Sequence, residues 1–314
     1  MQFYRETSLC ATSSFFVDEE FSGGYNGDKK FFGGIELRED DFVKKLPLRE
    51  QNVLWEHAAM EPQILFKIIR QEGEEELERS FSALAFSALA AGIFVSFSFF
   101  FRAVFHMHMG DSQFEPLISS LGYTTGFLIV ILGRMQLFTE NPITTMVPLF
   151  SEFSWKRLWK VLRLWSTVLF FNVVGTAISA AFMSSDYAVS PKLASALHEL
   201  ALHIMRLPAI DNVVRGIPAG IIIAALVWIA PQTRYFRFIT IMVFIYFIAL
   251  GDFSHVVVGS CEMAYEVIDG DADFAEYFFR FLIPTGLGNI IGGTFIFTML
   301  IYSQVRHELN KSKK

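Results

Sequence analysis

The chain has 314 residues, of which 53% are hydrophobic and only 18% are charged. Phenylalanine alone contributes 35 residues, which suits lipid-facing surfaces better than the core of a water-soluble domain. This composition indicates an integral membrane protein, and the net charge of −6 gives no indication of a nucleic-acid partner.

The sequence carries no pattern typical of an enzyme. We find no activated nucleophile and no phosphate-binding loop, so we expect neither catalysis nor a bound cofactor. Cys10 falls in a polar tail and Cys261 at the end of an apolar segment, which indicates neither a disulfide framework nor a metal motif.

The chain divides by composition into four parts. Residues 1–46 are polar and rich in glycine, and we expect them to form a flexible cytoplasmic tail. Residues 47–78 alternate apolar and charged side chains, as in an amphipathic helix at a membrane surface. Residues 79–305 contain the apolar segments, and residues 306–314 form a short basic cytoplasmic tail.

Six apolar segments are predicted to span the membrane, because a spanning helix needs about 20 apolar residues. Two of them, residues 116–150 and 238–264, are interrupted by polar side chains. The loop after the first segment holds His106 and His108, whose spacing does not share a helix face, so a metal site is not expected there. The uninterrupted segments are residues 81–101, 164–183, 216–230 and 281–302.

The two interruptions place polar groups at mid-membrane depth. The first follows an uncharged run that ends at Gly133, and it reads Arg134-Met135-Gln136-Leu137-Phe138-Thr139-Glu140-Asn141-Pro142. The second follows an uncharged run too short to cross a bilayer, and it brings in Asp252, Ser254 and His255. Such groups are costly unless they face protein or a water-filled cavity, so each interruption is either a structural kink or the lining of a passage.

A similar helical pattern follows each interruption. Asn172-Val-Val-Gly-Thr follows the first and Asn289-Ile-Ile-Gly-Gly-Thr the second, at nearly the same offset that separates Thr139 from His255. Two interrupted segments at matching positions in two halves of a chain indicate a transport site. We expect Asn172 and Asn289 themselves to bond helices together rather than to contact a substrate.

The charges in the loops predict the orientation in the membrane. The loop between the second and third segments, the turn at Arg234 and Arg237, and the C-terminal tail are all basic. Residues 262–279 contain six acidic residues and no lysine or arginine. The positive-inside rule therefore places both termini in the cytoplasm.

With these residues located, the sequence resembles the formate/nitrite transporter family over roughly residues 75–304. The resemblance rests on Leu137 to Asn141, on Arg215-Gly216 with Val227-Trp228, on His255, and on residues 283–293. It implies an all-α, aquaporin-like protomer of six transmembrane helices, with an inverted repeat in which the second and fifth helices are broken. It also implies a homopentamer in the lipid bilayer of the inner membrane, with one pore per protomer. Such pores pass small monovalent anions such as formate or nitrite, or the protonated weak acids.

The resemblance also implies roles for single residues. His255 would be the central pore histidine, with Thr139 beside it on the opposite broken helix. Leu137 and Phe138 would belong to an apolar constriction, and Ile248 would lie near the other apolar gate. The path would also be lined by Tyr123 and Phe127.

Several positions depart from the pattern of the family. Glu140 stands where a small residue is usual, and Gly259 stands where an asparagine is usual. Arg134 and Asp252 add charges beside the interruptions. The other departures are Gly220, in place of a second asparagine, and His203, the nearest cation to an expected lysine.

A narrow apolar pore excludes bare ions because removing a charge from water is costly. An imidazole can relay or polarise a proton for a weak acid, and we hypothesise this role for His255. The alternative is that His255 only bonds to Thr139 and locks two half-helices together.

The charged residues favour a second hypothesis. We expect Arg134 and Glu140 to pair with each other or with Asp252, since a buried charge needs a partner. An ionised Glu140 in the lumen would repel anions, and the acidic outer loop would attract cations. The charged residues therefore favour, as a second hypothesis, a channel for cations or neutral solutes on the same scaffold. A third hypothesis is a membrane scaffold or sensor whose N-terminal region binds a partner.

Overall fold

The computed structural model describes residues 31–32, 35–36 and 60–311, with side chains from residue 60 to residue 306. The chain divides into two units, Met1–Ala59 and Met60–Lys314. In the first unit, β1 (Phe31–Phe32) pairs antiparallel with β2 (Ile35–Glu36), and Phe31 lies opposite Glu36. The rest of the predicted flexible tail lies outside the described residues.

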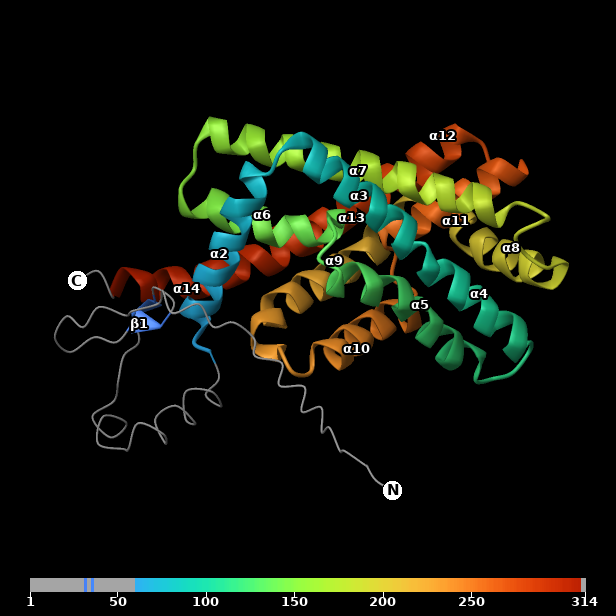
Figure 1. Ribbon diagram of the computed structural model, residues 1–314, viewed down its shortest axis with the longest axis horizontal. Helices are drawn as coiled ribbons and strands as arrows, with labels where there is room; N and C mark the ends of the chain where they lie inside the picture. The colour runs from blue at the N-terminus through green and yellow to red at the C-terminus, as the bar shows by residue number, and fades with distance from the viewer. Residues whose placement is uncertain (1–30, 33–34, 37–59, 312–314) are drawn as a thin grey trace, which may run out of the picture. The chain divides into compact units, whose positions relative to one another are not determined.

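The second unit is helical throughout (Figure 1). Its first half consists of α2 (Pro62–Glu78), α3 (Phe81–Val95), α4 (Phe97–Met109), α5 (Glu115–Leu132), the short 3₁₀ helix η2 (Phe138–Glu140), α6 (Asn141–Ser151) and α7 (Trp155–Met183). Its second half consists of α8 (Pro191–Met205), α9 (Ala209–Ile229), η3 (Ala230–Thr233), α10 (Arg237–Leu250), α11 (Val256–Asp269), α12 (Phe274–Glu276), η4 (Tyr277–Leu282), α13 (Ile283–Ile290), η5 (Ile291–Thr298) and α14 (Met299–Lys311).

Five helical stretches of the described chain are long and apolar enough to cross a membrane. The helix α10 is apolar but shorter, and α6 and α11 are also short. The chain therefore has the apolar helices of a membrane protein, as its composition predicts. The five stretches are Phe81–Met109, Glu115–Leu132, Trp155–Met183, Ala209–Thr233 and Phe274–Arg306.

The loop expected around His106 and His108 was wrong, and one helix extends beyond its apolar segment. His106 and His108 lie in the last turn of α4 and not in a loop, because the helix continues through Arg102, whose side chain lines a pocket inside the protein. The helix α7 begins at Trp155, before the apolar segment predicted for residues 164–183, because the Ser154 side chain caps it by accepting a hydrogen bond from Arg157 N at 3.1 Å.

Two pairs of helices, α3 with α7 and α9 with α13, pack so closely that their backbones are in contact. A Cβ atom on Gly92 of α3 would lie 2.2 Å from the Asn172 carbonyl oxygen of α7, and a Cβ atom on Gly220 of α9 would lie 2.2 Å from the Asn289 carbonyl oxygen of α13. Only glycine permits this approach. The same close packing therefore occurs once in each half of the chain.

The short helices cover the two ends of the helical body. At one end α2 contacts α6 and α14, and we call this the α2 end. At the other end α8 contacts α4 and α11, and we call this the α8 end (Figure 1).

Candidate functional site

The chain changes direction in the same way at both interruptions. After α5 ends, Arg134 adopts a left-handed backbone with φ of 52°, and after α10 ends Asp252 does the same with φ of 52°. In both cases the next residue donates its backbone N–H to a carbonyl of the preceding helix. Met135 N donates to the Val130 carbonyl and Phe253 N to the Ile248 carbonyl, each at 3.0 Å. A left-handed backbone is uncommon for residues other than glycine, so its occurrence at both places marks two copies of one turn.

Buried asparagine side chains hold the segments that follow these turns. Asn172 Oδ1 accepts a hydrogen bond from Phe138 N at 2.9 Å, and its Nδ2 donates to the carbonyls of Ala88 and Gln136 at 2.7 and 2.9 Å. Two of these groups, Phe138 N and the Gln136 carbonyl, lie at the interruption, and the Ala88 carbonyl lies inside α3, so the amide ties the interruption to a neighbouring helix. Asn289 makes the corresponding three bonds, from Val256 N and to the carbonyls of Gly216 and Ser254.

The two interrupted segments meet at His255 and Thr139. Thr139 Oγ1 lies 2.8 Å from His255 Nε2, and each residue is only 2% exposed. Val258 N donates to His255 Nδ1 at 3.3 Å, so the imidazole caps the first turn of α11. Because Nδ1 accepts this bond, the proton of the neutral ring is assigned to Nε2, which then donates to Thr139.

Aromatic rings surround the imidazole on its α5 side. The Phe127 ring lies edge-on to His255 with 4.8 Å between centroids, and Tyr123 lies 5.6 Å from Phe127. Phe138 instead packs against Trp165 at 6.1 Å. Tyr123 also lines the small pocket that lies beside His255.

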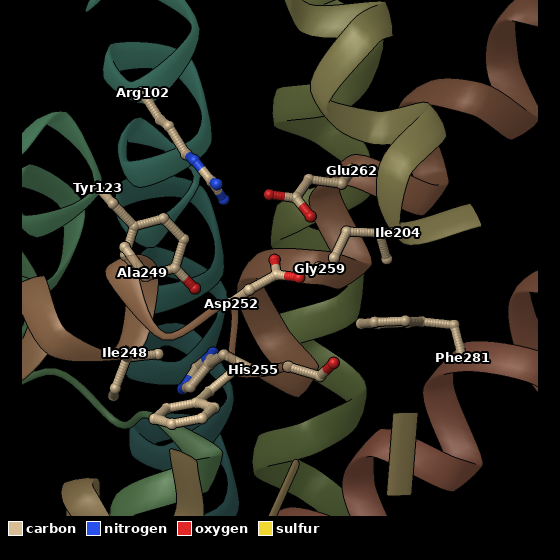
Figure 2. Close-up of a pocket in the computed structure, with 12 residues that line it drawn as sticks. Arg102, Tyr123, Ile204, Ile248, Ala249, Asp252, His255, Gly259, Glu262 and Phe281 are labelled. Atoms are coloured by element: carbon tan, nitrogen blue, oxygen red, sulfur yellow. The ribbon is translucent and has the colours of Figure 1, made fainter. Parts of the chain in front are cut away.

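A small pocket of about 10 Å³ opens from His255 toward the α8 end, which is room for roughly one water molecule. Figure 2 shows the Arg102 side chain pointing toward the Glu262 carboxylate, with Asp252 between them and His255. The apolar wall of this pocket includes Ile248, which is fully buried. Gly259 also lines it, and a Cβ atom there would lie 2.2 Å from the Phe281 ring, so this ring fills the space that a side chain at position 259 would need.

A larger pocket of about 390 Å³ lies at the α2 end, large enough to hold many water molecules. Leu137 and Glu140 line it beside α2. The Glu140 Oε1 atom is buried and has no hydrogen-bond partner among the described residues. The other charged groups around this pocket are Glu72, Glu75, Glu76, Arg79, Arg134 and Arg237.

The expected pairing of Arg134 and Glu140 does not occur. Arg134 is 78% exposed at its side chain and approaches Glu72 of α2 at 3.6 Å. Asp252 is paired with Arg215 of α9 and with His203 of α8, the latter at 2.8 Å. The hydrogen bond to Asp252 raises the pKa of His203 above its usual value.

Sequence reasoning missed three charged residues of this site. Arg102 and Glu262 resemble charges at the ends of membrane segments, and nothing local in the sequence shows that both line one pocket. Arg215 belongs to the Arg-Gly motif noted above, but its pairing with Asp252 depends on how α9 packs. An intramembrane acid requires a cation, and that rule could have prompted a search for Arg215.

A model described as "Formate/nitrite transporter" matches residues 63–303 of this chain. The chain belongs to the formate/nitrite transporter family. It is 33% identical over 280 residues to the inner membrane protein YfdC of Escherichia coli K12, with 89% of each chain covered. It is 22% identical over 259 residues to the formate channel FocA of the same organism, covering 74% of this chain and 90% of FocA.

Solved structures of the family have the same fold. A pentameric formate channel with formate bound superposes with a TM-score of 0.62 at 19% identity, covering 72% of this chain and 97% of that one. An ion channel of the family superposes with a TM-score of 0.64 at 16% identity, covering 77% and 98%. The chain therefore has the fold of a formate/nitrite transporter channel.

Proposed function

We propose that this chain forms a channel for small monovalent anions, or for the weak acids they form when protonated, with formate and nitrite as the reference substrates. The observation that carries the proposal is the buried contact between His255 and Thr139. It lies between a pocket that includes His255 at the α8 end and a pocket that includes Leu137 at the α2 end. We take the path between them as the pore of the protomer.

The narrow point favours a weak acid over a bare ion. Leu137 and Phe127 are each at most 1% exposed, and a charge that passes them loses its hydration without compensation. The Nε2–H of His255 can leave Thr139 and donate to the oxygen of a passing carboxylate or nitrite. The imidazole thereby offers one hydrogen bond where water is excluded, and it can relay a proton by giving up the one on Nε2 once Nδ1 has taken up another from water.

We further infer six membrane crossings, two of them interrupted, with α5 continuing into α6 and α10 into α11. The repeated left-handed turns and the two matching asparagines support an inverted repeat. The pentameric assembly named for the structural relative supports a homopentamer with one pore per protomer. The charges of the loops favour an inner-membrane orientation with the α2 end and both termini in the cytoplasm.

Uptake of labelled formate into proteoliposomes under an inward proton gradient tests the proposal. A His255→Asn variant keeps a side-chain oxygen that can cap α11 but cannot relay a proton. We expect it to lose most of the pH-dependent uptake, whereas His108→Asn, on the exposed end of α4, leaves uptake unchanged. Full pH-dependent uptake by His255→Asn would contradict the proposed role.

A channel for cations or neutral solutes is the second candidate, and Glu140 favours it. The α2-end pocket has four glutamates against three arginines, and Glu140 lacks a hydrogen-bond partner among the described residues. Asp252 gives this candidate less support, because Arg215 and His203 both pair with it. Reversal potentials of the wild type and of Glu140→Gln distinguish the candidates: selectivity for potassium that Glu140→Gln abolishes would favour the second.

A further inference from the structure

Three potential metal ligands meet at the α8 end, outside the site described above. His198 lies on α8, Glu266 lies on the last turns of α11, and Asp271 follows that helix. His198 Nδ1 is 3.2 Å from Glu266 Oε1 and 3.7 Å from Asp271 Oδ2. One ligand atom from each residue lies within 4.8 Å of the other two.

The burial of Glu266 indicates that this cluster is incomplete without a cation. The Glu266 side chain is 0% exposed, and its Oε2 atom has no hydrogen-bond partner in the part of the chain that the structure describes. A buried carboxylate needs a compensating positive charge, yet its nearest ion-pair partner is a histidine that also approaches a second acid.

The backbone after α11 fixes the second carboxylate in place. Gly270, Asp271 and Ala272 all donate their N–H groups to the Glu266 carbonyl, at 3.0, 2.9 and 3.2 Å. Gly270 has φ of 90°, which turns the chain back on itself and brings Asp271 next to the Glu266 side chain. Two carboxylates are therefore held against one imidazole by a tight turn, although they repel each other when both are ionised.

The spacing fits a small divalent cation. Ligand atoms about 2.0–2.2 Å from a tetrahedral Zn²⁺ lie roughly 3.4 Å apart, close to the two distances from His198 Nδ1. We propose that His198, Glu266 and Asp271 bind a divalent transition metal, with Zn²⁺ as the cation that this ligand set fits best. One imidazole nitrogen with two carboxylates suits zinc, whereas Mg²⁺ and Ca²⁺ take oxygen ligands alone.

The exposure of the other two ligands gives the cation a route into the site. The side chains of His198 and Asp271 are 38% and 54% exposed, so the ion can enter from water and keep a water molecule as fourth ligand. The bound ion joins α8 to the end of α11. Since α8 contributes Ile204 to the pocket at His255, the metal restrains the helix that covers this end of the pore.

Zinc titration of the full-length protein in detergent, with any affinity tag removed, tests the site. We expect one Zn²⁺ per chain by calorimetry, unaffected by excess Mg²⁺. His198→Gln and Asp271→Asn should each weaken binding by at least about tenfold, because each removes one of three protein ligands. The matched controls, His108→Gln and Asp186→Asn, change exposed residues of the same types elsewhere and should bind zinc as the wild type does.

A measurement on the wild type alone guards against misfolded variants. Bound Zn²⁺ should slow hydrogen exchange of the α8 amides, and Co²⁺ in its place should give the visible absorption of a four-coordinate site. Zinc binding by the wild type no tighter than by His198→Gln would overturn the proposal. So would an equal loss of binding in His108→Gln, because the ion would then lie elsewhere.

Discussion

At the scale of single residues, the protonation of His255 follows from its two hydrogen bonds. Nδ1 accepts from Val258 N and Nε2 lies against Thr139 Oγ1, so the neutral ring satisfies both neighbours at once. A second proton on the ring would set two N–H groups against each other at the start of α11. The contact therefore favours a neutral imidazole that holds its one N–H toward Thr139.

Removing the Thr139 hydroxyl should show how much this contact contributes to the free energy of unfolding. Thr139→Val keeps the shape of the side chain but leaves the His255 Nε2–H without a partner in a buried place, which costs about 1–3 kcal/mol of unfolding free energy. Thr139→Ser keeps the hydroxyl and should lose less. Equilibrium unfolding in mixed detergents compares the two, and equal stability of Thr139→Val and the wild type would contradict the contact.

The sequence predicted polar residues more reliably than their partners. His255 and Thr139 stood out because each interrupts an apolar run, and the structure brings them to 2.8 Å. The partner of Arg134 was not predictable, because the left-handed turn at Arg134 directs its side chain toward Glu72 of α2 rather than toward the next acid along the chain. Local sequence therefore shows which residues are costly to bury but not which element compensates them.

At the scale of elements, histidine–carboxylate contacts hold α8 to the rest of the protein. His203 pairs with Asp252, His198 with Glu266, and Glu199 of α8 with His106 of α4. Apolar residues at helical spacing between Ala194 and Ile204 account for the helical form of α8. The partners of these three α8 side chains come from distant segments of the chain. Only the fold therefore reveals that three histidine–carboxylate contacts lie along α8.

The stability that His203 contributes should depend on pH. Its folded-state pKa is raised by Asp252, so the charged pair stabilises the protein fully below the unfolded value of about 6.5. The contribution is lost as pH rises through the higher folded-state pKa. We expect the difference in thermal midpoint between the wild type and His203→Gln to be largest near pH 6 and to shrink toward pH 9. A difference that grows with pH would have the wrong sign for this pair.

The close packing of α9 against α13 makes a single methyl group disruptive. A Cβ atom on Gly220 would lie 2.2 Å from a backbone carbonyl, so Gly220→Ala must force the two helices apart. Gly286→Ala is a matched control on α13, because its Cβ atom would meet only Val256 at 3.7 Å. We expect Gly220→Ala to lower the yield of folded protein and its thermal midpoint, and Gly286→Ala to leave both near the wild type. Equal behaviour of the two variants would contradict the packing.

At the scale of the whole molecule, the two halves repeat one hydrogen-bonding plan. The sequence predicted a repeat by matching Thr139 to His255, but the turns at Arg134 and Asp252 match Thr139 to Val257 and Leu137 to His255. The error arose because Thr139 and His255 were matched as polar residues in the sequence. The positions of the two left-handed backbone turns define which residues of the two halves correspond. The contact between His255 and Thr139 therefore joins non-equivalent residues, an imidazole at one position and a hydroxyl two places further along in the other half.

Substitutions of Asn172 and Asn289 test whether the two halves position a single shared contact between His255 and Thr139. Asn172 holds Phe138 N, next to Thr139, and Asn289 holds Val256 N, next to His255, so each positions one side of the same contact. Asn172→Leu and Asn289→Leu should each destabilise the protein by about 2–6 kcal/mol, because two buried backbone groups at the interruption lose their partner at about 1–3 kcal/mol each.

Their effects on formate uptake should not add. Once either side of the contact has moved, moving the other costs little more, so the double variant should transport about as well as the worse single variant. Ser179→Ala, which removes only a bond to the Ile93 carbonyl on α3, is the control and should leave uptake intact. Independent, multiplying losses in the double variant would mean that the two halves do not meet at a single functional point. Measured uptake in all four backgrounds, corrected for the amount of folded protein, decides between these outcomes.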